Sequence, residues 1–286
     1  MQNNYKVKIG NTTIGDGNQI PFIAEIGVNH LGNYNRAIKM IDLAIEGRAD
    51  FLKFQTYDYK NRYFKSNPKY KEFTNLVKPW QFSKNKEKEL WKYAKKKGAK
   101  VFTSVYDLKT ITFTEELGTI AYKVAAFELN NHKLIKGILE TKKPLIISCG
   151  LTNYQEIDKM VDLLEKHNAK YILLHTVSSY PLEEKYSYLI KIRDLKNRYQ
   201  CPVGHSDHTP GTNIPILAGA VGANIIEKHF TDEPKHRLSD NFFSITKEQL
   251  IKIKYDLKYL HQILYSPDYD KNDPEKFMRN FIKRSN

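Results

Sequence analysis

The sequence predicts a (β/α)₈ barrel, the α/β fold also called a TIM barrel, and three observations carry this prediction. Short apolar runs alternate with helical patterns eight times along the chain. Most of these runs are almost continuously apolar or β-branched, as in a parallel sheet that is buried on both faces. The 286 residues, of which 41% are hydrophobic, can bury one large core. We therefore expect a single domain over residues 1–286.

The first 21 residues precede this alternation. Turn signals at 9–11 (Ile-Gly-Asn) and 15–17 (Gly-Asp-Gly) predict an N-terminal β-hairpin, which we expect to cover the floor of the barrel. The barrel is then predicted over 22–266, and residues 267–286 are expected to form a C-terminal tail.

Strands and helices follow in a strict order within the predicted barrel. Strands are expected at Phe22–Asn29, Phe51–Thr56, Lys100–Ser104, Ala121–Ala126, Pro144–Cys149, Tyr171–Thr176, Val203–Ser206 and Ala223–His229. Helices are expected at Tyr34–Glu46, Lys84–Lys97, Leu108–Leu117, His132–Thr141, Tyr154–His167, Tyr186–Tyr199, Gly211–Val221 and Thr246–Leu264. Residues 57–82 are too many for an ordinary loop between a strand and a helix, and long loops of this kind often cap active sites.

Charge and hydropathy exclude two classes of partner. The formal net charge is +14, but the lysines are mixed with acids along amphipathic helices, and no zinc-finger spacing, helix-turn-helix signal or RNA-binding aromatic motif is present. We therefore expect no nucleic-acid binding, although a basic field would steer a phosphorylated or carboxylated substrate into a cleft. No apolar run approaches the roughly 20 residues that span a bilayer, and the polar N-terminus lacks a signal peptide, so we expect a cytoplasmic protein without membrane contact.

Polar residues cluster at the C-terminal ends of the predicted strands, where barrels of this class keep their chemistry. In chain order they are Glu25, Lys53, Ser104, Lys123, Glu128, Ser148, Ser178, Ser179, Ser206, His208, Glu227 and His229. In a strand, Glu227 and His229 project from the same face and Lys228 from the opposite one. His208 and His229 end consecutive strands, so this pair of imidazoles predicts a half-site for a divalent metal.

Two lysines lie within otherwise apolar strands. Lys53 and Lys123 could be paired within the protein, but a buried unpaired ammonium is so unfavourable that we expect them to bind an anion. Hydroxyl and ammonium groups that converge from several strands suit a phosphate and a carboxylate.

Six motifs together resemble the sialic acid synthase family, which includes N-acetylneuraminate, legionaminate and pseudaminate synthases. They are FIAEIGVNH (22–30), LKFQT (52–56), YKVA (122–125), SSYP (178–181), GHSDHT (204–209) and EKHF (227–230). The resemblance runs in order from about Asn11 to Leu250. It implies a carbon–carbon bond-forming transferase that condenses phosphoenolpyruvate with an open-chain N-acylated hexose, such as N-acetylmannosamine. The product would be a nine-carbon 2-keto sugar acid, formed with release of phosphate.

The resemblance also assigns roles to the polar residues. His208 and His229 would hold the metal, with Mn²⁺ expected first and Mg²⁺ or Co²⁺ as alternatives, and the metal would polarise the aldehyde oxygen. Glu25 and Asp240 would position and deprotonate the attacking water, and Lys123 is expected to act with them. Phosphoenolpyruvate would be bound by Lys53, Ser104, Lys123, Ser148, Ser178 and Ser206. The sugar would be bound by Glu128, Tyr180 and Glu227.

The chain departs from the family pattern at three points. Ala126 stands where the family usually has a serine, and Asn241 stands after Asp240 where a histidine is usual. A C-terminal antifreeze-like domain, whose arginine reaches the sugar in the partner subunit, is expected to be absent. A homodimer or a separate chain would then complete the sugar site.

Two alternatives to the leading hypothesis stay open. One is a phosphoenolpyruvate-dependent synthase that acts on another aldose. The other is a non-catalytic barrel that serves as a partner subunit.

Overall fold

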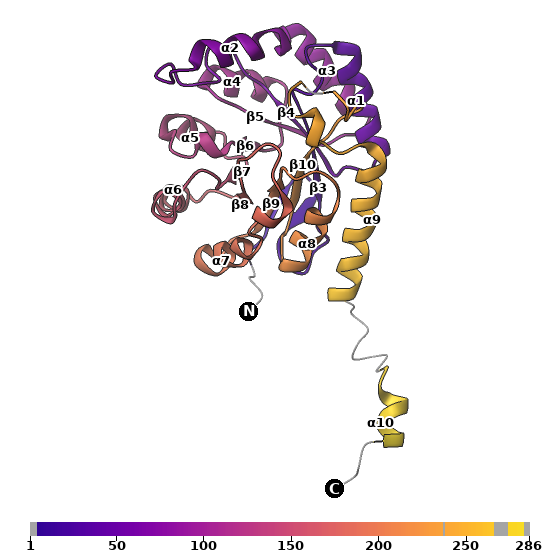
Figure 1. Ribbon diagram of the computed structural model, residues 1–286. Coiled ribbons are helices and arrows are strands. Elements are labelled where there is room, and N and C mark those ends of the chain that lie inside the picture. Colours follow the sequence, from indigo (N-terminus) through magenta and orange to yellow (C-terminus); the bar gives the residue numbers. More distant parts are fainter. Residues whose placement is uncertain (1–4, 237, 266–273, 283–286) are drawn as a thin grey trace.

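The computed structural model describes residues 5–236, 238–265 and 274–282, and its centre is a closed barrel of parallel strands (Figure 1). Around the barrel the order is β10–β3–β4–β5–β6–β7–β8–β9. The strands are β3 (Phe22–Gly27), β4 (Phe51–Gln55), β5 (Val101–Ser104), β6 (Tyr122–Val124), β7 (Leu145–Ser148), β8 (Tyr171–Thr176), β9 (Val203–Asp207) and β10 (Ile226–His229). This order confirms the predicted (β/α)₈ architecture.

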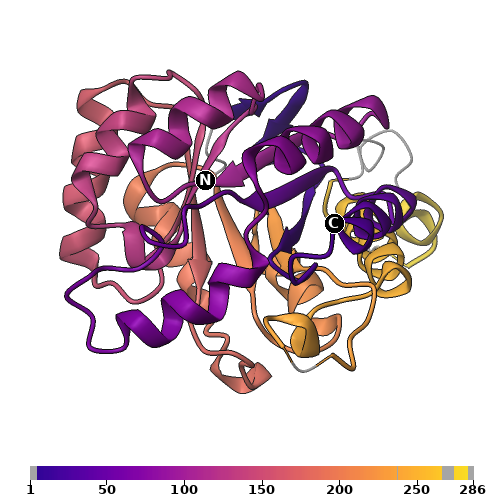
Figure 2. The same ribbon diagram turned by 90° about the horizontal axis from the view of Figure 1, so that it is seen from above.

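Helices surround the strands on all sides, as the view from above in Figure 2 shows. They are α1 (Tyr34–Glu46), α2 (Tyr70–Val77), α3 (Lys84–Lys96), α4 (Leu108–Glu116), α5 (His132–Leu139), α6 (Tyr154–Lys166), α7 (Ile190–Tyr199), α8 (Asn213–Val221) and α9 (Lys247–Leu264). Short 3₁₀ turns are η1 (Lys78–Trp80), η2 (Ala126–Glu128), η3 (Glu184–Tyr186) and η4 (Asn241–Phe243). Among the described residues, no helix is both long enough and apolar enough to span a bilayer.

Three elements differ from the prediction. The long segment 57–82 contains helix α2, in which Thr74 and Val77 are buried. Val77 belongs to a cluster with Val28, Tyr57, Trp80 and Tyr106. Helix α7 begins at Ile190 and not at Tyr186, because Tyr188 has a φ of +44°, outside the helical region. A further helix, α10 (Lys276–Ile282), lies in the predicted tail, whose residues 267–273 and 283–286 fall outside the described part of the chain.

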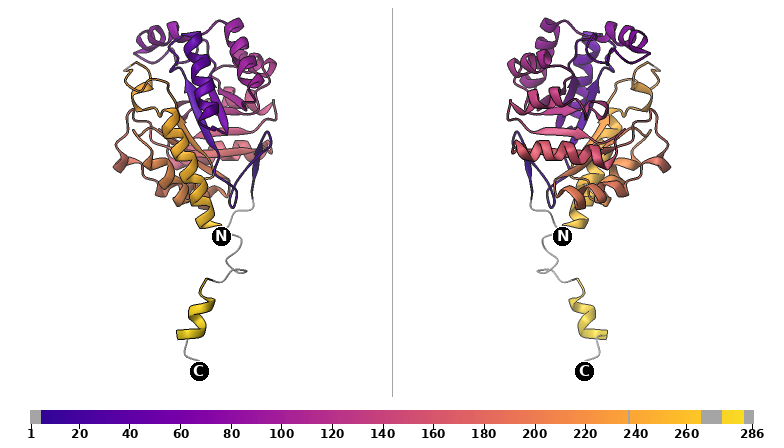
Figure 3. Two further views of the ribbon diagram at one scale, coloured as in Figure 1. Left: turned by 90° about the vertical axis from the view of Figure 1, so that its right-hand side faces the viewer. Right: turned by 90° about the vertical axis from the view of Figure 1, so that its left-hand side faces the viewer.

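The N-terminal hairpin, β1 (Val7–Ile9) and β2 (Thr12–Ile14), fills the floor of the barrel as predicted. Both views of Figure 3 show this hairpin (indigo) on the side of the N-terminus. Val7, Ile9 and Ile14 are fully buried and pack against the lowest inward-facing side chains of the strands. Those side chains are Ile23, Phe51, Phe102, Ala121, Ile146, Ile172, Leu174 and Ile225.

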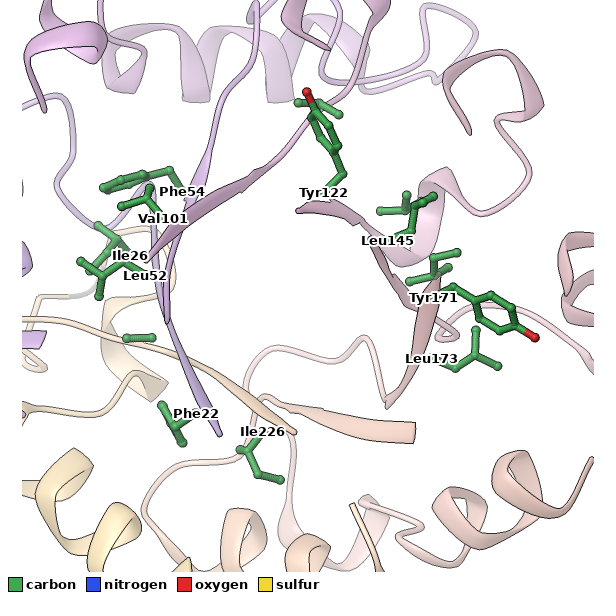
Figure 4. Close-up of a cluster of buried hydrophobic side chains, with 14 of the residues drawn as sticks. Phe22, Ile26, Leu52, Phe54, Val101, Tyr122, Leu145, Tyr171, Leu173 and Ile226 are labelled. Carbon is green, nitrogen blue, oxygen red and sulfur yellow. The ribbon is translucent and has the colours of Figure 1, made fainter. Parts of the chain in front are cut away.

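Outward-facing side chains of the strands form the larger core, between the barrel and its helices. Figure 4 shows part of this cluster, including Phe22, Leu52, Tyr122, Leu173 and Ile226. Helix α1 contributes buried residues to the same cluster through one apolar stripe, with spacing typical of an amphipathic helix.

The inner face of the barrel changes from apolar to polar along each strand. On β3, Ile23 belongs to the floor and Glu25, two residues later, to the layer above it. On β4, Phe51 and Lys53 repeat the pattern, and β5 repeats it with Phe102 and Ser104. Because strand side chains alternate with a period of two, this sequence pattern places a buried polar layer directly above an apolar plug.

Candidate active site

A cavity of about 300 Å³ opens above the polar layer, at the C-terminal ends of the strands. Side chains from every strand of the barrel except β3 line it, together with residues of the segment 57–82 and of the loop after β10. The polar lining consists of Lys53, Gln55, Arg62, Tyr63, Ser104, Tyr106, Lys123, Ser148, Thr176, Ser178, Tyr180, Ser206, His208, Glu227, His229 and Asp240. The structure thus brings residues up to 187 positions apart, Lys53 and Asp240, into one chamber.

Two lysines and two glutamates form a continuous charge cluster in the polar layer. Lys53 Nζ lies 2.5 Å from Glu25 Oε2 and 3.2 Å from Glu227 Oε2. Lys123 Nζ lies 3.7 Å from Glu227 Oε1 and donates to Ser148 Oγ at 2.6 Å. Glu227 therefore lies between the two ammonium groups, and all four charged side chains are at most 6% exposed.

The cluster bears on the expectation for the two lysines. We expected Lys53 and Lys123 to bind an anion, with pairing inside the protein as the alternative, and each has a carboxylate partner within the protein. Anion binding by these lysines stays a prediction. The pairing arises because strands adjacent in the barrel place acids and bases at the same height. Glu25 is the register partner of Lys53 across β3 and β4. The lysines still line the cavity, so their ammonium groups remain within reach of a bound molecule.

The surroundings shift the pKa values of these groups in different directions. Burial raises the pKa of Glu25, an effect that Lys53 only partly opposes. Burial acts in the same direction on Glu227, but Lys123 and Lys53 outweigh it and the pKa of Glu227 falls. Burial lowers the pKa of Lys123 to about 8. Near neutral pH, Glu25 can therefore exchange a proton while Glu227 stays ionised.

The two histidines predicted to bind metal face the same cavity. Their ring centroids are 5.9 Å apart, and burial lowers the pKa of His208 to about 4 and that of His229 to about 3. Both imidazoles are therefore neutral at pH 7, the form that ligates metal. His208 Nδ1 lies 2.9 Å from the Val177 carbonyl oxygen, a contact that requires the proton on Nδ1 and leaves the Nε2 lone pair free.

His229 supports the same interpretation through an unsatisfied atom. Its Nδ1 is buried without a hydrogen-bond partner and lies 3.7 Å from Asp240 Oδ2. The described residues contain no group of three His, Cys, Asp or Glu side chains arranged to hold a metal ion. The donor set therefore fits a divalent ion only as a two-histidine site whose other positions are filled by water or substrate.

Asp240 is held over the cavity by a hydrogen-bond network. Its backbone N–H donates to Asn29 Oδ1 at 3.2 Å, and the Asn29 amide donates to the Phe230 carbonyl and to Ser244 Oγ, both at 2.9 Å. Asn29 is fully buried. It therefore ties the end of β3 to the loop after β10 that carries Asp240.

Most of the candidate residues line the cavity, and three do not. Those that do are Lys53, Ser104, Lys123, Ser148, Ser178, Tyr180, Ser206, His208, Glu227, His229 and Asp240. Glu25 lies beside Lys53 on the neighbouring strand and outside the lining. Ser179 is exposed and also lies outside the lining. Glu128 is buried and accepts a hydrogen bond from Asn131 Nδ2 at 2.6 Å, so the structure does not bring it to the cavity. The roles assigned to all these residues stay predictions.

One wall of the cavity is aromatic and cationic, and the sequence did not predict it. Arg62 and Tyr63, from the segment 57–82, line the cavity beside Tyr106 and Phe127. The rings of Tyr106 and Phe127 are stacked, with centroids 5.9 Å apart and an interplanar angle of 11°. One feature of the sequence could have indicated this wall. The segment 57–82 is rich in tyrosine, and its basic residues are lysines except for Arg62.

Comparison of the sequence with known protein families identifies the family of this chain. A model of the NeuB family matches residues 40–268. The chain belongs to the NeuB family. Its membership confirms the resemblance to sialic acid synthases that the six motifs indicated.

Individual relatives of this NeuB-family chain carry related names. An N,N'-diacetyllegionaminic acid synthase of Campylobacter jejuni is 30% identical and is matched over 92% of this chain and 83% of its own length. A pseudaminic acid synthase of the same species is 32% identical, over 84% of this chain and 72% of its own. The solved structure of an N-acetylneuraminic acid synthetase from Leptospira borgpetersenii is 34% identical, with a TM-score of 0.90 over 98% of both chains.

Proposed function

We propose that this NeuB-family chain condenses phosphoenolpyruvate with the open-chain aldehyde of an N-acylated hexose to give a nine-carbon 2-keto acid and phosphate. One observation carries the proposal: buried lysines, serine hydroxyls and two neutral imidazoles line a single cavity. The names of the relatives support it, since they describe synthases of sialic, legionaminic and pseudaminic acids.

The donor would be bound by the lysine–serine wall. Lys53 donates to Ser104 Oγ at 3.4 Å and Lys123 to Ser148 Oγ at 2.6 Å, so each ammonium is paired with a hydroxyl at a strand end. Such groups can share the charge of a phosphate and a carboxylate. Fixed donors in a water-poor site also stabilise charge that develops during reaction.

The new carbon–carbon bond leaves an electron-poor centre at the former enol carbon, and this centre must take up water. Glu25 or Asp240 would remove the proton from that water, after which the carbon–oxygen bond to the leaving phosphate breaks. Glu25 lies outside the cavity lining but contacts Lys53 and Gln55, which line it. Its raised pKa would let it accept and return a proton near neutral pH. Burial also raises the pKa of Asp240.

His208 and His229 would hold a divalent ion, with Mn²⁺ the first candidate, and when bound this ion would polarise the aldehyde oxygen of the acceptor. The neutral imidazoles, the free Nε2 of His208 and the unsatisfied Nδ1 of His229 support this part of the proposal.

The test is phosphate release from phosphoenolpyruvate with Mn²⁺ and a panel of acceptors. The panel contains N-acetylmannosamine, its 6-phosphate, 2,4-diacetamido-trideoxyhexoses and simple aldoses. Release with one acceptor, lost in Glu25→Gln and Lys123→Met but kept in the exposed control Lys166→Met, is the expected result. Release with a simple aldose alone would identify the alternative synthase. Folded, metal-loaded protein that neither binds phosphoenolpyruvate nor releases phosphate would overturn the proposal.

A further inference from the structure

Arg62 is a buried cation in the cavity wall that the proposed reaction does not yet use. It is 9% exposed, and it comes from the segment between β4 and α3 and not from a strand end. Its guanidinium carbon lies 4.5 Å from the ring centroid of Tyr57, 5.2 Å from that of Tyr106 and 5.8 Å from that of Tyr63. These rings hold the planar group in position by cation–π contacts.

The hydrogen bonds of Arg62 are incomplete. Nη2 donates to Gln55 Oε1 at 2.6 Å, but the buried Nε and Nη1 make no hydrogen bond of good geometry. None of the described carboxylates forms an ion pair with the guanidinium, although Asp240 lines the same cavity. Leaving buried donors of a charged group unsatisfied is unfavourable, so the geometry is that of a site awaiting an acceptor.

Arg62 differs in this respect from the two lysines. Lys53 is paired with Glu25 and Glu227, and Lys123 with Glu227. An anion entering the cavity therefore meets two lysines that already have carboxylate partners and an arginine that has none among the described residues. The planar fork of a guanidinium can donate two parallel hydrogen bonds to a carboxylate or phosphate.

We propose that Arg62 binds an oxyanion of a substrate, through Nε and Nη1, in the mouth of the barrel. The inference rests on the proposed function and extends it with a residue from outside the strand ends. The oxyanion is a phosphate or carboxylate, supplied by phosphoenolpyruvate or by a phosphorylated acceptor. Gln55 links this contact to the polar layer, because its Nε2 donates to Glu25 Oε1 at 3.0 Å while its Oε1 accepts from Arg62.

The test measures equilibrium binding without turnover. Phosphoenolpyruvate, inorganic phosphate and N-acetylmannosamine 6-phosphate are each titrated into wild-type protein, Arg62→Met and Arg62→Lys. Arg62→Met keeps an aliphatic stem against the tyrosines, and the matched control Lys65→Met removes an exposed cation from the same segment. We expect Arg62→Met to weaken binding about 10- to 100-fold, the effect of losing hydrogen bonds to a charged group. Arg62→Lys should recover part of the loss, and Lys65→Met should bind as the wild type does.

The titrations separate the possible outcomes. A loss confined to phosphoenolpyruvate assigns Arg62 to the donor, whereas a loss confined to the sugar phosphate assigns it to the acceptor. Unchanged affinity for all three ligands, in variants that unfold at the wild-type temperature, would overturn the inference. Wild-type protein that binds inorganic phosphate through Arg62 but not phosphoenolpyruvate would support the anion site while contradicting the proposed function.

Discussion

Lys228 and Asp207 form an ion pair on the outer face of the barrel, directly behind the residues that face the cavity. Both side chains are fully buried. Asp207 accepts hydrogen bonds from the backbone N–H and hydroxyl of Thr209, and Lys228 donates to the Thr209 carbonyl oxygen. The pair therefore braces the chain on both sides of His208.

Removing one member of this pair should be strongly destabilising. Lys228→Met leaves Asp207 buried and uncompensated, which costs about 3–5 kcal/mol. Urea denaturation measures the loss. The matched control is Lys252→Met, which breaks an exposed pair with Asp256 and should change the free energy of unfolding by about 0–1 kcal/mol. Equal losses in the two variants would contradict the structural role of the buried pair.

Alanine substitutions at two glycines should differ in their effect on stability, because one new Cβ would meet backbone and the other the end of a side chain. A Cβ on Gly204 would lie 2.4 Å from the Ile225 carbonyl oxygen, whereas one on Gly137 would lie 2.4 Å from Leu108 Cδ2, the end of a partly exposed side chain. We expect Gly204→Ala to cost about 1–3 kcal/mol or more, because backbone must move. Gly137→Ala should be neutral or stabilising by up to about 1 kcal/mol, since alanine favours the helix. Thermal unfolding of both variants checks the order, and the reverse order would refute it.

Glu87 should make stability fall as pH rises through the mildly acidic range. Burial raises its pKa from 4.5 to about 7 in the folded protein. The folded state then binds more protons than the unfolded state between these values, so the free energy of unfolding decreases as pH rises between them. Glu87→Gln should flatten this part of the curve and be more stable than wild type above pH 7. The exposed neighbour Glu89→Gln is the control, and a Glu87→Gln curve parallel to wild type would exclude the effect.

Asn29 should act on catalysis as a positioning residue. Asn29→Ala removes the side-chain bonds to Phe230, Ser244 and the backbone of Asp240. We expect kcat to fall about 10- to 100-fold through misplacement of Asp240, with a smaller change in KM for phosphoenolpyruvate. Steady-state kinetics separates the two constants. A change in KM alone would assign Asn29 to substrate binding.

The sequence predicted the parts of the fold that depend on local pattern. Alternation of apolar runs and helical segments identified the barrel, and the period of two placed Glu227 and His229 in the cavity with Lys228 behind it. The sequence could not predict which charged side chains form ion pairs, because that depends on strand register and on closure of the barrel. The pairing of Lys53 with Glu227 joins residues 174 positions apart.

The structure of the segment 57–82 was harder to predict, for a different reason. Helix α2 has only eight residues, so its apolar spacing is too short to stand out from a tyrosine- and lysine-rich background. Arg62 contacts Gln55 and three tyrosines only because this segment folds back over the strand ends. Local pattern identified the segment as a cap but not the cation that it inserts.

The apolar plug formed by the hairpin at the barrel floor has a kinetic consequence. With Val7, Ile9 and Ile14 filling one end, reactants and products exchange with solvent at the other end, beside the segment 57–82. In the proposed reaction, the 2-keto acid product would therefore diffuse out along the route by which the next donor arrives. The carboxylate that the product inherits from phosphoenolpyruvate and the released phosphate would compete with incoming phosphoenolpyruvate for the same cations, so product accumulation should slow turnover competitively with respect to the donor.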